Sequence, residues 1–170
     1  MDDPSGIVIR RVYFVEMTMR AYRFLFALSI LLVVPFSQNG WAQQTPAERT
    51  LFDEANHSRR DQGLSPLKWD EALAVAARRH AAEMAKHGSI SHQFPGEPSL
   101  PGRATKAGAH YISLSENVAE APKATEIHGM WMNSPHHRAN LLDPDMNSMG
   151  VGVVSKNGQF YAVEDFSKAR

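Results

Sequence analysis

Two adjacent histidines near the C-terminal end of the chain are the first candidates for chemistry. They lie in the stretch WMNSPHHRANLLDP, as His136 and His137, after a Ser-Pro pair and before Arg138. An imidazole changes its charge close to neutral pH, so it can serve as a base or as a metal ligand. Either the pair lies at a helix start with incidental imidazoles, or one of them is present for its chemistry.

Several common catalytic patterns are absent from the sequence. It contains no cysteine, hence no C-x-x-C, and no H-E-x-x-H. Without a G-x-S-x-G motif, Ser134 is interpreted as a cap for the turn that begins at Pro135, rather than as a nucleophile. Lys plus Arg and Asp plus Glu both number 18, so the charge balance predicts no nucleic-acid partner.

The first 42 residues are predicted to be an N-terminal extension with a signal peptide. Arg20 and Arg23 precede an apolar run over 24–34, and Gly40 and Ala42 fit the −3 and −1 positions of a cleavage site. A membrane span needs roughly 20 apolar residues, and this run is shorter. A retained anchor is the alternative. The start codon is left open among three methionines: Met1, Met17 and Met19.

Residues 43–170 are predicted to form one exported domain, secreted or periplasmic, with no stable membrane span once the signal is removed. Because this part has no cysteine, its stability must come from core packing, which a domain of more than about 100 residues can supply. We expect a monomer whose partner is an extracellular lipid, glycan or protein.

Two helices are predicted at the start of the domain. Thr45 and Glu48 form a T-x-x-E capping box, and Gly63 ends the first helix. Asp70 and Gly88 fit the N-cap and the C-terminal end of the second. His80 lies on the apolar stripe of that second helix and is expected to be a buried histidine with hydrogen-bond partners.

A loop is predicted next, over 89–109, because proline and glycine are frequent there. His92 lies at its start. A short extended segment then carries Glu116 and Asn117, and both Asn117 and Asn140 are expected to hydrogen-bond the backbone. A third helix is predicted over 122–133, followed by a short helical turn. Three side chains of this helix are expected to face inward: Ile127, Met130 and Trp131. His128 is expected to lie on the surface or at a cleft rim.

The chain is predicted to end in a β-hairpin. MGVGVV alternates, KNG indicates a turn, and QFYAVEDF forms the return strand. Gly150 and Gly152 fall on one face, which indicates that another element packs closely there. Glu164 is expected to face inward, where a cleft histidine is one possible partner. The order of elements predicts an α+β fold with a small antiparallel sheet covered by helices.

These segments together resemble the CAP superfamily of cysteine-rich secretory, antigen-five and plant pathogenesis-related proteins, in its bacterial SCP-like form. The resemblance rests on LKWDEALAVAARRHAAEMA, SH, SENVAEA, WMNSPHHRANLLDP, MGVGVV and YAVEDF, in that order, and covers about residues 51–166. It implies an α–β–α sandwich with a cleft lined by two histidines and two acids. The family's first histidine, glutamate and second histidine fall on His92, Glu116 and His137, whereas Ser134 replaces the second acid. The disulfides of the eukaryotic members are also absent.

Three functions are compatible with this cleft. Two imidazoles and a carboxylate, His92, His137 and Glu116, could hold Zn²⁺ with an open fourth position, as in catalytic zinc sites. The domain would then be a metal-dependent hydrolase that acts on peptide or cell-wall material. Alternatively, Glu116 orients an imidazole as a base, or the cluster is a structural network in a recognition module. The resemblance favours a secreted binding module, with a divalent metal as an optional component.

Overall fold

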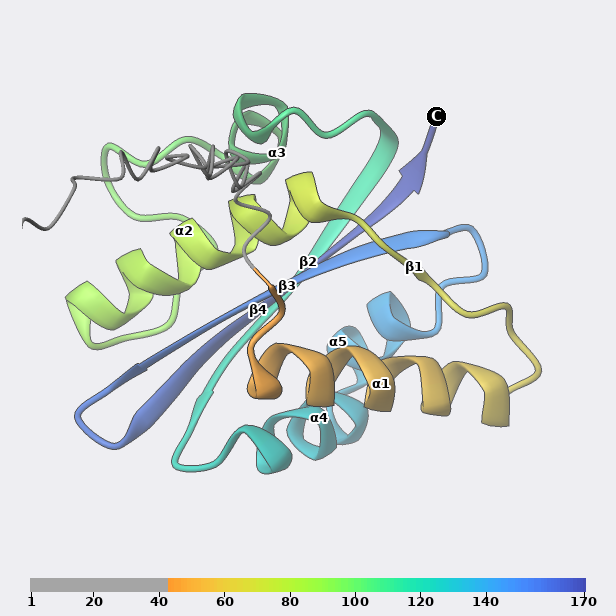
Figure 1. Ribbon diagram of the computed structural model, residues 1–170, viewed down its shortest axis with the longest axis horizontal. Helices are drawn as coiled ribbons and strands as arrows, with labels where there is room; N and C mark the ends of the chain where they lie inside the picture. The colour runs from red at the N-terminus through yellow and green to blue at the C-terminus, as the bar shows by residue number, and fades with distance from the viewer. Residues whose placement is uncertain (1–42) are drawn as a thin grey trace, which may run out of the picture. The chain divides into compact units, whose positions relative to one another are not determined.

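The computed structural model describes residues 43–170, so the predicted signal peptide lies outside the described residues (Figure 1). The described part contains five helices and four strands. In chain order they are α1 (Pro46–Asp61), β1 (Lys68–Trp69), α2 (Glu71–His87), α3 (Leu100–Ala107), β2 (Tyr111–Ala121), α4 (Ala124–Asn133), α5 (Pro135–Leu141), β3 (Ser148–Lys156) and β4 (Gln159–Ala169).

The ends of α1 and α2 lie where the capping residues predict them. Thr45 Oγ1 accepts from Glu48 N at 3.2 Å, and Glu48 Oε2 accepts from Thr45 N at 2.9 Å, which completes the capping box. Asp70 Oδ1 accepts from Leu73 N at 3.1 Å at the start of α2. Gly88 ends α2 in the left-handed conformation, with φ of 66°.

The segment predicted as a loop over 89–109 contains helix α3, so that prediction was wrong in part. Its proline and glycine occupy the positions that helix ends favour. Pro101 lies in the first turn of α3, and Gly108 forms the C-cap with φ of 93°. Residues that usually interrupt regular structure here delimit a helix of 8 residues.

Helix α4 begins at Ala124, two residues after the predicted start. Ile127 and Trp131 are buried as expected, because residues four apart share one helix face. Met130 was predicted to face inward, but it is 48% exposed. It lies roughly 100° around the helix from Trp131 and therefore points to the solvent side.

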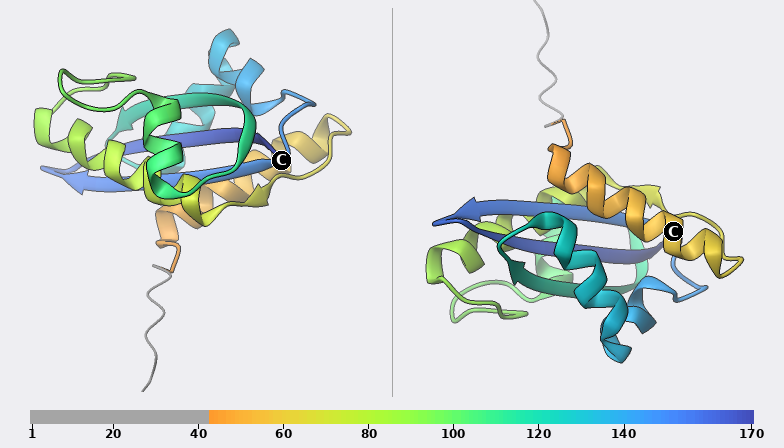
Figure 2. Two further views of the ribbon diagram at one scale, coloured as in Figure 1. Left: turned by 90° about the horizontal axis from the view of Figure 1, so that it is seen from above. Right: turned by 90° about the horizontal axis from the view of Figure 1, so that it is seen from below.

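A four-stranded sheet in the order β1-β3-β4-β2 forms the middle layer. β4 pairs antiparallel with β3, as the hairpin predicts, and also with β2, while the two-residue β1 pairs parallel with β3. Helices α2 and α3 cover one face, and α1, α4 and α5 cover the other (Figures 1 and 2). The described residues therefore form the predicted α–β–α sandwich.

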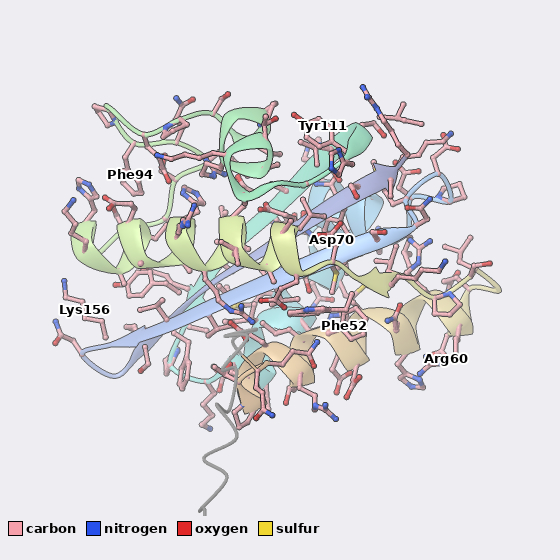
Figure 3. All side chains as sticks on the ribbon, turned by 45° about the horizontal axis from the view of Figure 1, so that its top comes forward. Phe52, Arg60, Asp70, Phe94, Tyr111 and Lys156 are labelled. Carbon is pink, nitrogen blue, oxygen red and sulfur yellow. The ribbon has the colours of Figure 1, made fainter. Side chains whose placement is uncertain are left out.

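Hydrophobic side chains fill both spaces between the sheet and its helices. The larger cluster centres on Trp131 and Phe166, and the smaller one lies under α2 around Met84 and Val163. Figure 3 shows the side chains of α2 packed along the sheet, from Asp70 at its N-terminal end. None of the helices in the described part is long and apolar enough to span a bilayer.

The two glycines of β3 allow α2 to lie directly on the sheet. A Cβ atom added at Gly150 would come within 2.1 Å of Ala74 N, and one at Gly152 within 2.2 Å of the Ala77 carbonyl carbon. Any side chain there would overlap the helix backbone. The predicted close packing against this strand face is confirmed.

Candidate functional site

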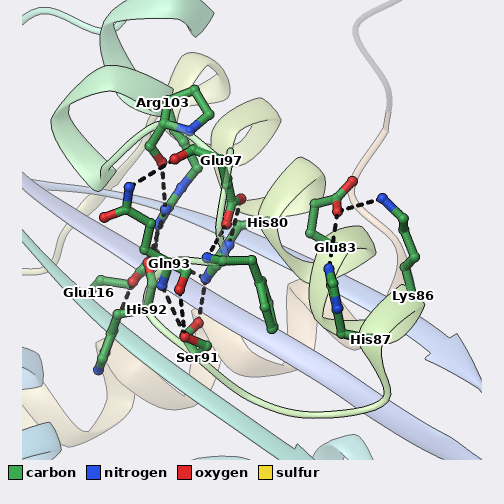
Figure 4. A network of polar contacts seen from close by, with 12 residues as sticks. His80, Glu83, Lys86, His87, Ser91, His92, Gln93, Glu97, Arg103 and Glu116 are labelled. Atoms are coloured by element: carbon green, nitrogen blue, oxygen red, sulfur yellow. Dashed lines mark hydrogen bonds and ion pairs between the residues drawn. The ribbon is translucent and has the colours of Figure 1, made fainter.

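Glu116 on β2 is the buried residue that holds the other side chains of the candidate site in position. Its side chain is only 3% exposed, and its Oε1 lies 2.8 Å from Nδ1 of His92 in the loop after α2. Arg103 of α3 pairs with the other oxygen, Oε2, and also donates to the His92 carbonyl at 3.0 Å (Figure 4). The carboxylate therefore fixes both an imidazole and a guanidinium.

His92 is exposed at the surface above this anchor, with 63% of its side chain accessible. The hydrogen bond with Glu116 raises the pKa of His92, and partial burial and the Arg103 charge oppose that rise. With Nδ1 turned to the carboxylate, Nε2 makes no hydrogen bond to any described residue. His92 thus presents one oriented ring nitrogen to a ligand.

His137 of α5 lies beside the same strand. Asn117 Nδ2 donates to the His137 carbonyl at 3.1 Å, and Asn140 Nδ2 donates to the Glu116 carbonyl at 3.2 Å and to Asn117 Oδ1 at 2.9 Å. The two asparagines bond the backbone as predicted. Burial lowers the pKa of His137, and the charges of nearby His92 and His136 add to the effect. The His92 side chain therefore contacts Glu116, and the backbone of His137 is bonded to Asn117, the next residue of the same strand.

Ser134 lies at the junction of α4 and α5, as the C-cap of one and the N-cap of the other. Its position fits the predicted cap, but its side chain makes no capping hydrogen bond. The place of the family's second acid is therefore taken by a half-buried hydroxyl that supplies no charge to the cleft.

The predicted zinc ligands do not fit a three-ligand metal site. Both oxygens of Glu116 are engaged, one by His92 and one by Arg103. Within residues 43–170 no group of three or more His, Cys, Asp or Glu side chains is arranged to hold a metal ion. Two imidazoles fall short of the three protein ligands of a catalytic zinc.

A buried polar network continues from Glu116 toward α2. His80 is fully buried, and its ring nitrogens lie 2.8 Å from Glu97 Oε1 and 2.7 Å from the Ser91 carbonyl. Its Nε2 also lies 4.0 Å from Glu116 Oε2. His80 is thus the hydrogen-bonded core histidine that the sequence predicts, and it holds in place the loop that carries His92.

Two acids on β4 are buried near this region; Glu164 was expected to face inward, whereas the burial of Asp165 was not predicted from the sequence. Glu164 and Asp165 are both fully buried, and their carboxyl oxygens make no hydrogen bond within the described residues. Burial raises the pKa of each well above its ordinary value. Glu164 faces inward as expected, and the strand register places it between Asn117 and Val151; the histidine that the sequence offered as one possible partner makes no hydrogen bond to it within the described residues.

His128 is buried, so its predicted place on the surface or the cleft rim was wrong. It is 8% exposed, and its Nε2 lies 2.9 Å from Ser58 Oγ on α1. It lies one residue after Ile127, at the edge of the face that α4 turns to α1. Burial lowers the pKa of His128.

The comparisons with known proteins agree with this fold. The family model of the CAP domain, the cysteine-rich secretory protein family, matches residues 52–166. YkwD of Bacillus subtilis is 35% identical over 108 residues, which are 63% of this chain and 42% of YkwD. The membrane protein YlbC of the same organism is 30% identical over 154 residues, which are 88% of this chain and 42% of YlbC.

A solved structure shows the same arrangement of elements. An extracellular SCP-domain protein from Bacillus anthracis superposes with a TM-score of 0.65 at 27% identity, over 72% of this chain and 40% of that one. The chain spans less than half the length of these relatives. The family match covers well over half of the chain, and the chain therefore belongs to the cysteine-rich secretory protein, or CAP, family.

Proposed function

We propose that this chain is an extracellular CAP domain that recognises a polar ligand through the cleft between His92 and His137. The observation that carries the proposal is the His92–Glu116 pair at 2.8 Å. A buried carboxylate that orients an exposed imidazole is a costly arrangement for a surface that binds nothing, because the buried charge needs Arg103 as a further partner. Such an arrangement is typical of sites that present one ring nitrogen outward.

The ligand chemistry follows from the charge states of the two histidines. His92 gains a proton more readily than a free histidine and can donate a hydrogen bond. His137 loses its proton more readily and can accept one. A ligand with neighbouring donors and acceptors, such as the amide and hydroxyl groups of a glycan or a peptide, matches this pair better than a lipid chain does.

The extracellular location rests on the predicted signal peptide and on the relatives. The apolar run over 24–34 and the Gly40/Ala42 pair fit export, and the Bacillus anthracis neighbour is an extracellular protein. We propose that the exported domain acts as a monomer. A metal-dependent hydrolase is the weaker alternative, because no group of three or more His, Cys, Asp or Glu side chains within the described residues is arranged to hold a metal ion.

The test is a titration of the exported protein, labelled with ¹⁵N, with triacetylchitotriose and separately with tetra-alanine. We expect saturable shifts of the ring nitrogens of His92 and His137 with at least one of the two probes. His137→Ala should weaken that binding several-fold, whereas His110→Ala, at an exposed position just before β2, should not. Unchanged ring signals with both probes, or an equal effect of the two substitutions, would refute the proposal.

A further inference from the structure

A concave site that His92 and His137 do not line lies next to Arg103. It is a pocket of about 710 Å³ between α2, α3 and the loop that follows His92. This volume is in the range that small-molecule sites occupy. Its walls include Arg79 and Lys86 of α2 and Arg103 and Lys106 of α3, but none of the three candidate cleft residues His92, Glu116 and His137.

Two of the cations on the walls have no ionic partner among the described residues. Four basic and two acidic side chains line the pocket, and of the basic ones Lys86 pairs with Glu83 and Arg103 pairs with Glu116, which is not part of the lining. Both acids are already engaged, Glu83 with Lys86 at 3.0 Å and Glu97 with His80 at 2.8 Å (Figure 4). Arg79 and Lys106 make no ion pair or hydrogen bond to any described residue. Cations that face one another across a cavity repel, and an anion between them removes that repulsion.

Arg103 supplies a buried donor at the same place. The residue is 5% exposed, and its terminal nitrogens are used by Glu116, His92 and Pro98. Its Nε is buried and has no hydrogen-bond partner. The contacts of the terminal nitrogens fix the Arg103 guanidinium at the wall of the pocket, where its positive charge adds to the attraction for an anion.

The remaining wall is apolar. Phe94, Pro95 and Pro98 line it together with Ala82 of α2. Phe94 is held from the other side, because its ring stacks on His87 at 4.2 Å between centroids and packs against the cluster under α2. A fixed aromatic ring next to a group of cations suits a ligand with an anionic head and an apolar body.

We propose that this pocket binds a small organic phosphate, with the phosphate between Arg79, Lys106 and Arg103 and the apolar group against Phe94. A phosphate monoester carries close to two negative charges at neutral pH and offers three strong acceptor oxygens, which matches the two cations without an ionic partner and donors from two walls. A carboxylate carries one charge and would leave a cation unpaired. This site is separate from the proposed recognition cleft and does not depend on it.

The experiment is a titration of the exported, ¹⁵N-labelled protein at about pH 7.5 with three probes: phenyl phosphate, inorganic phosphate and phenylacetate. We expect saturable binding of phenyl phosphate with amide shifts around Phe94, Gly96 and Lys106, and clearly weaker binding of the other two. Equal affinity for phenylacetate would overturn the assignment of a phosphate, and equal affinity for inorganic phosphate would overturn the apolar contact.

Matched variants separate the pocket from a general charge effect. Arg79→Gln and Lys106→Gln should each weaken phenyl phosphate binding by roughly tenfold, the effect typical of losing one charged hydrogen bond. Lys123→Gln removes the same charge from an exposed position before α4 and should leave the affinity unchanged. His137→Ala should also leave it unchanged. No saturable binding, or equal losses in Lys123→Gln and Lys106→Gln, would overturn the proposal.

Discussion

Glu116 and Asp165 lie directly opposite each other on the neighbouring strands β2 and β4. Cross-strand partners share one face of a sheet, so the two carboxyl groups are neighbours on that face. Only one of them has a cationic partner, since Arg103 pairs with Glu116 while the Asp165 oxygens make no hydrogen bond within the described residues. Burial and the nearby Glu116 charge raise the pKa of Asp165, so this carboxyl group favours its neutral form.

Replacing Asp165 with asparagine should flatten the dependence of stability on pH. The folded-state pKa lies above the unfolded value of about 3.9. The folded protein therefore keeps a proton that the unfolded chain releases, and the free energy of unfolding falls as the pH rises from about 4 toward the folded-state pKa. Asp165→Asn removes this loss, so its stability should fall less than that of the wild type between about pH 4 and about pH 8.

Urea unfolding at about pH 4 and about pH 8 measures the effect. The control is Asp53→Asn, which removes an exposed carboxylate from α1 and should leave the difference between the two pH values unchanged. If the stability of Asp165→Asn changes between the two pH values as much as that of the wild type, the raised pKa of Asp165 is contradicted.

Replacing Glu116 with glutamine should lower the pKa of His92. The hydrogen bond with the Glu116 carboxylate is the main cause of the raised value, and a neutral amide cannot stabilise an imidazolium to the same degree. An NMR titration of the ring signals gives the pKa directly. Glu120→Gln removes the same charge from β2 four residues away and should change the value far less. The titration of His128, on the opposite face of the sheet, should be the same in all three proteins.

Replacing Gly152 with alanine should destabilise the fold by about 3 kcal/mol or more, because the added methyl group overlaps the backbone of α2 at Ala77. Gly129→Ala is the matched control. Gly129 lies in α4 with nothing within 4 Å of an added Cβ atom. Alanine is the better helix former, so this variant should gain about 0.5–1 kcal/mol. Thermal unfolding compares the two, and a Gly152→Ala protein of wild-type stability would disprove the close packing of β3 and α2.

Local signals in the sequence were sufficient to predict most of the fold. Asp70 and Gly88 delimit α2 because helix ends need particular caps, and the alternation around Gly150 and Gly152 predicts both the strand and its tight packing. Proline and glycine led to a wrong prediction at Pro101 and Gly108, where a loop was expected and α3 is found. These residues fit helix ends as well as loops, and only the contact of α3 with α2 and β2 decides between the two.

The candidate site was predictable only where motif order identified its members. His92, Glu116 and His137 come from separate segments, and their proximity depends on the fold. Nothing local indicates that Asp165 lies opposite Glu116, because strand register is a long-range property. Arg103 lies in the segment predicted as a loop, and its contact with Glu116 was not predicted because it too depends on the long-range fold. Its role follows from the distance between α3 and β2, which no pattern within α3 contains.

Zinc should bind at most weakly and should not be needed for folding. His92 and His137 are the candidate imidazole ligands, and the oxygens of the third candidate, Glu116, already contact His92 and Arg103. Structural zinc sites contribute about 10–16 kcal/mol and require a complete ligand set. A domain with its own core should therefore keep its circular dichroism spectrum and its melting temperature in excess chelator. A large loss of stability on chelation would contradict this account.

The dependence of weak zinc binding on pH would identify its ligands. Only neutral imidazoles ligate, so protons compete with the metal. The raised pKa of His92 makes it the first to be protonated, and the lowered pKa of His137 keeps that ring available. The affinity should therefore fall while the pH is still above the free histidine value of about 6.5. Calorimetric titration at about pH 8 and about pH 5.5 tests this.

His137→Ala should abolish the binding, whereas His136→Ala, at the exposed neighbouring position, should preserve it. Equal binding by both variants would place the metal away from the cleft.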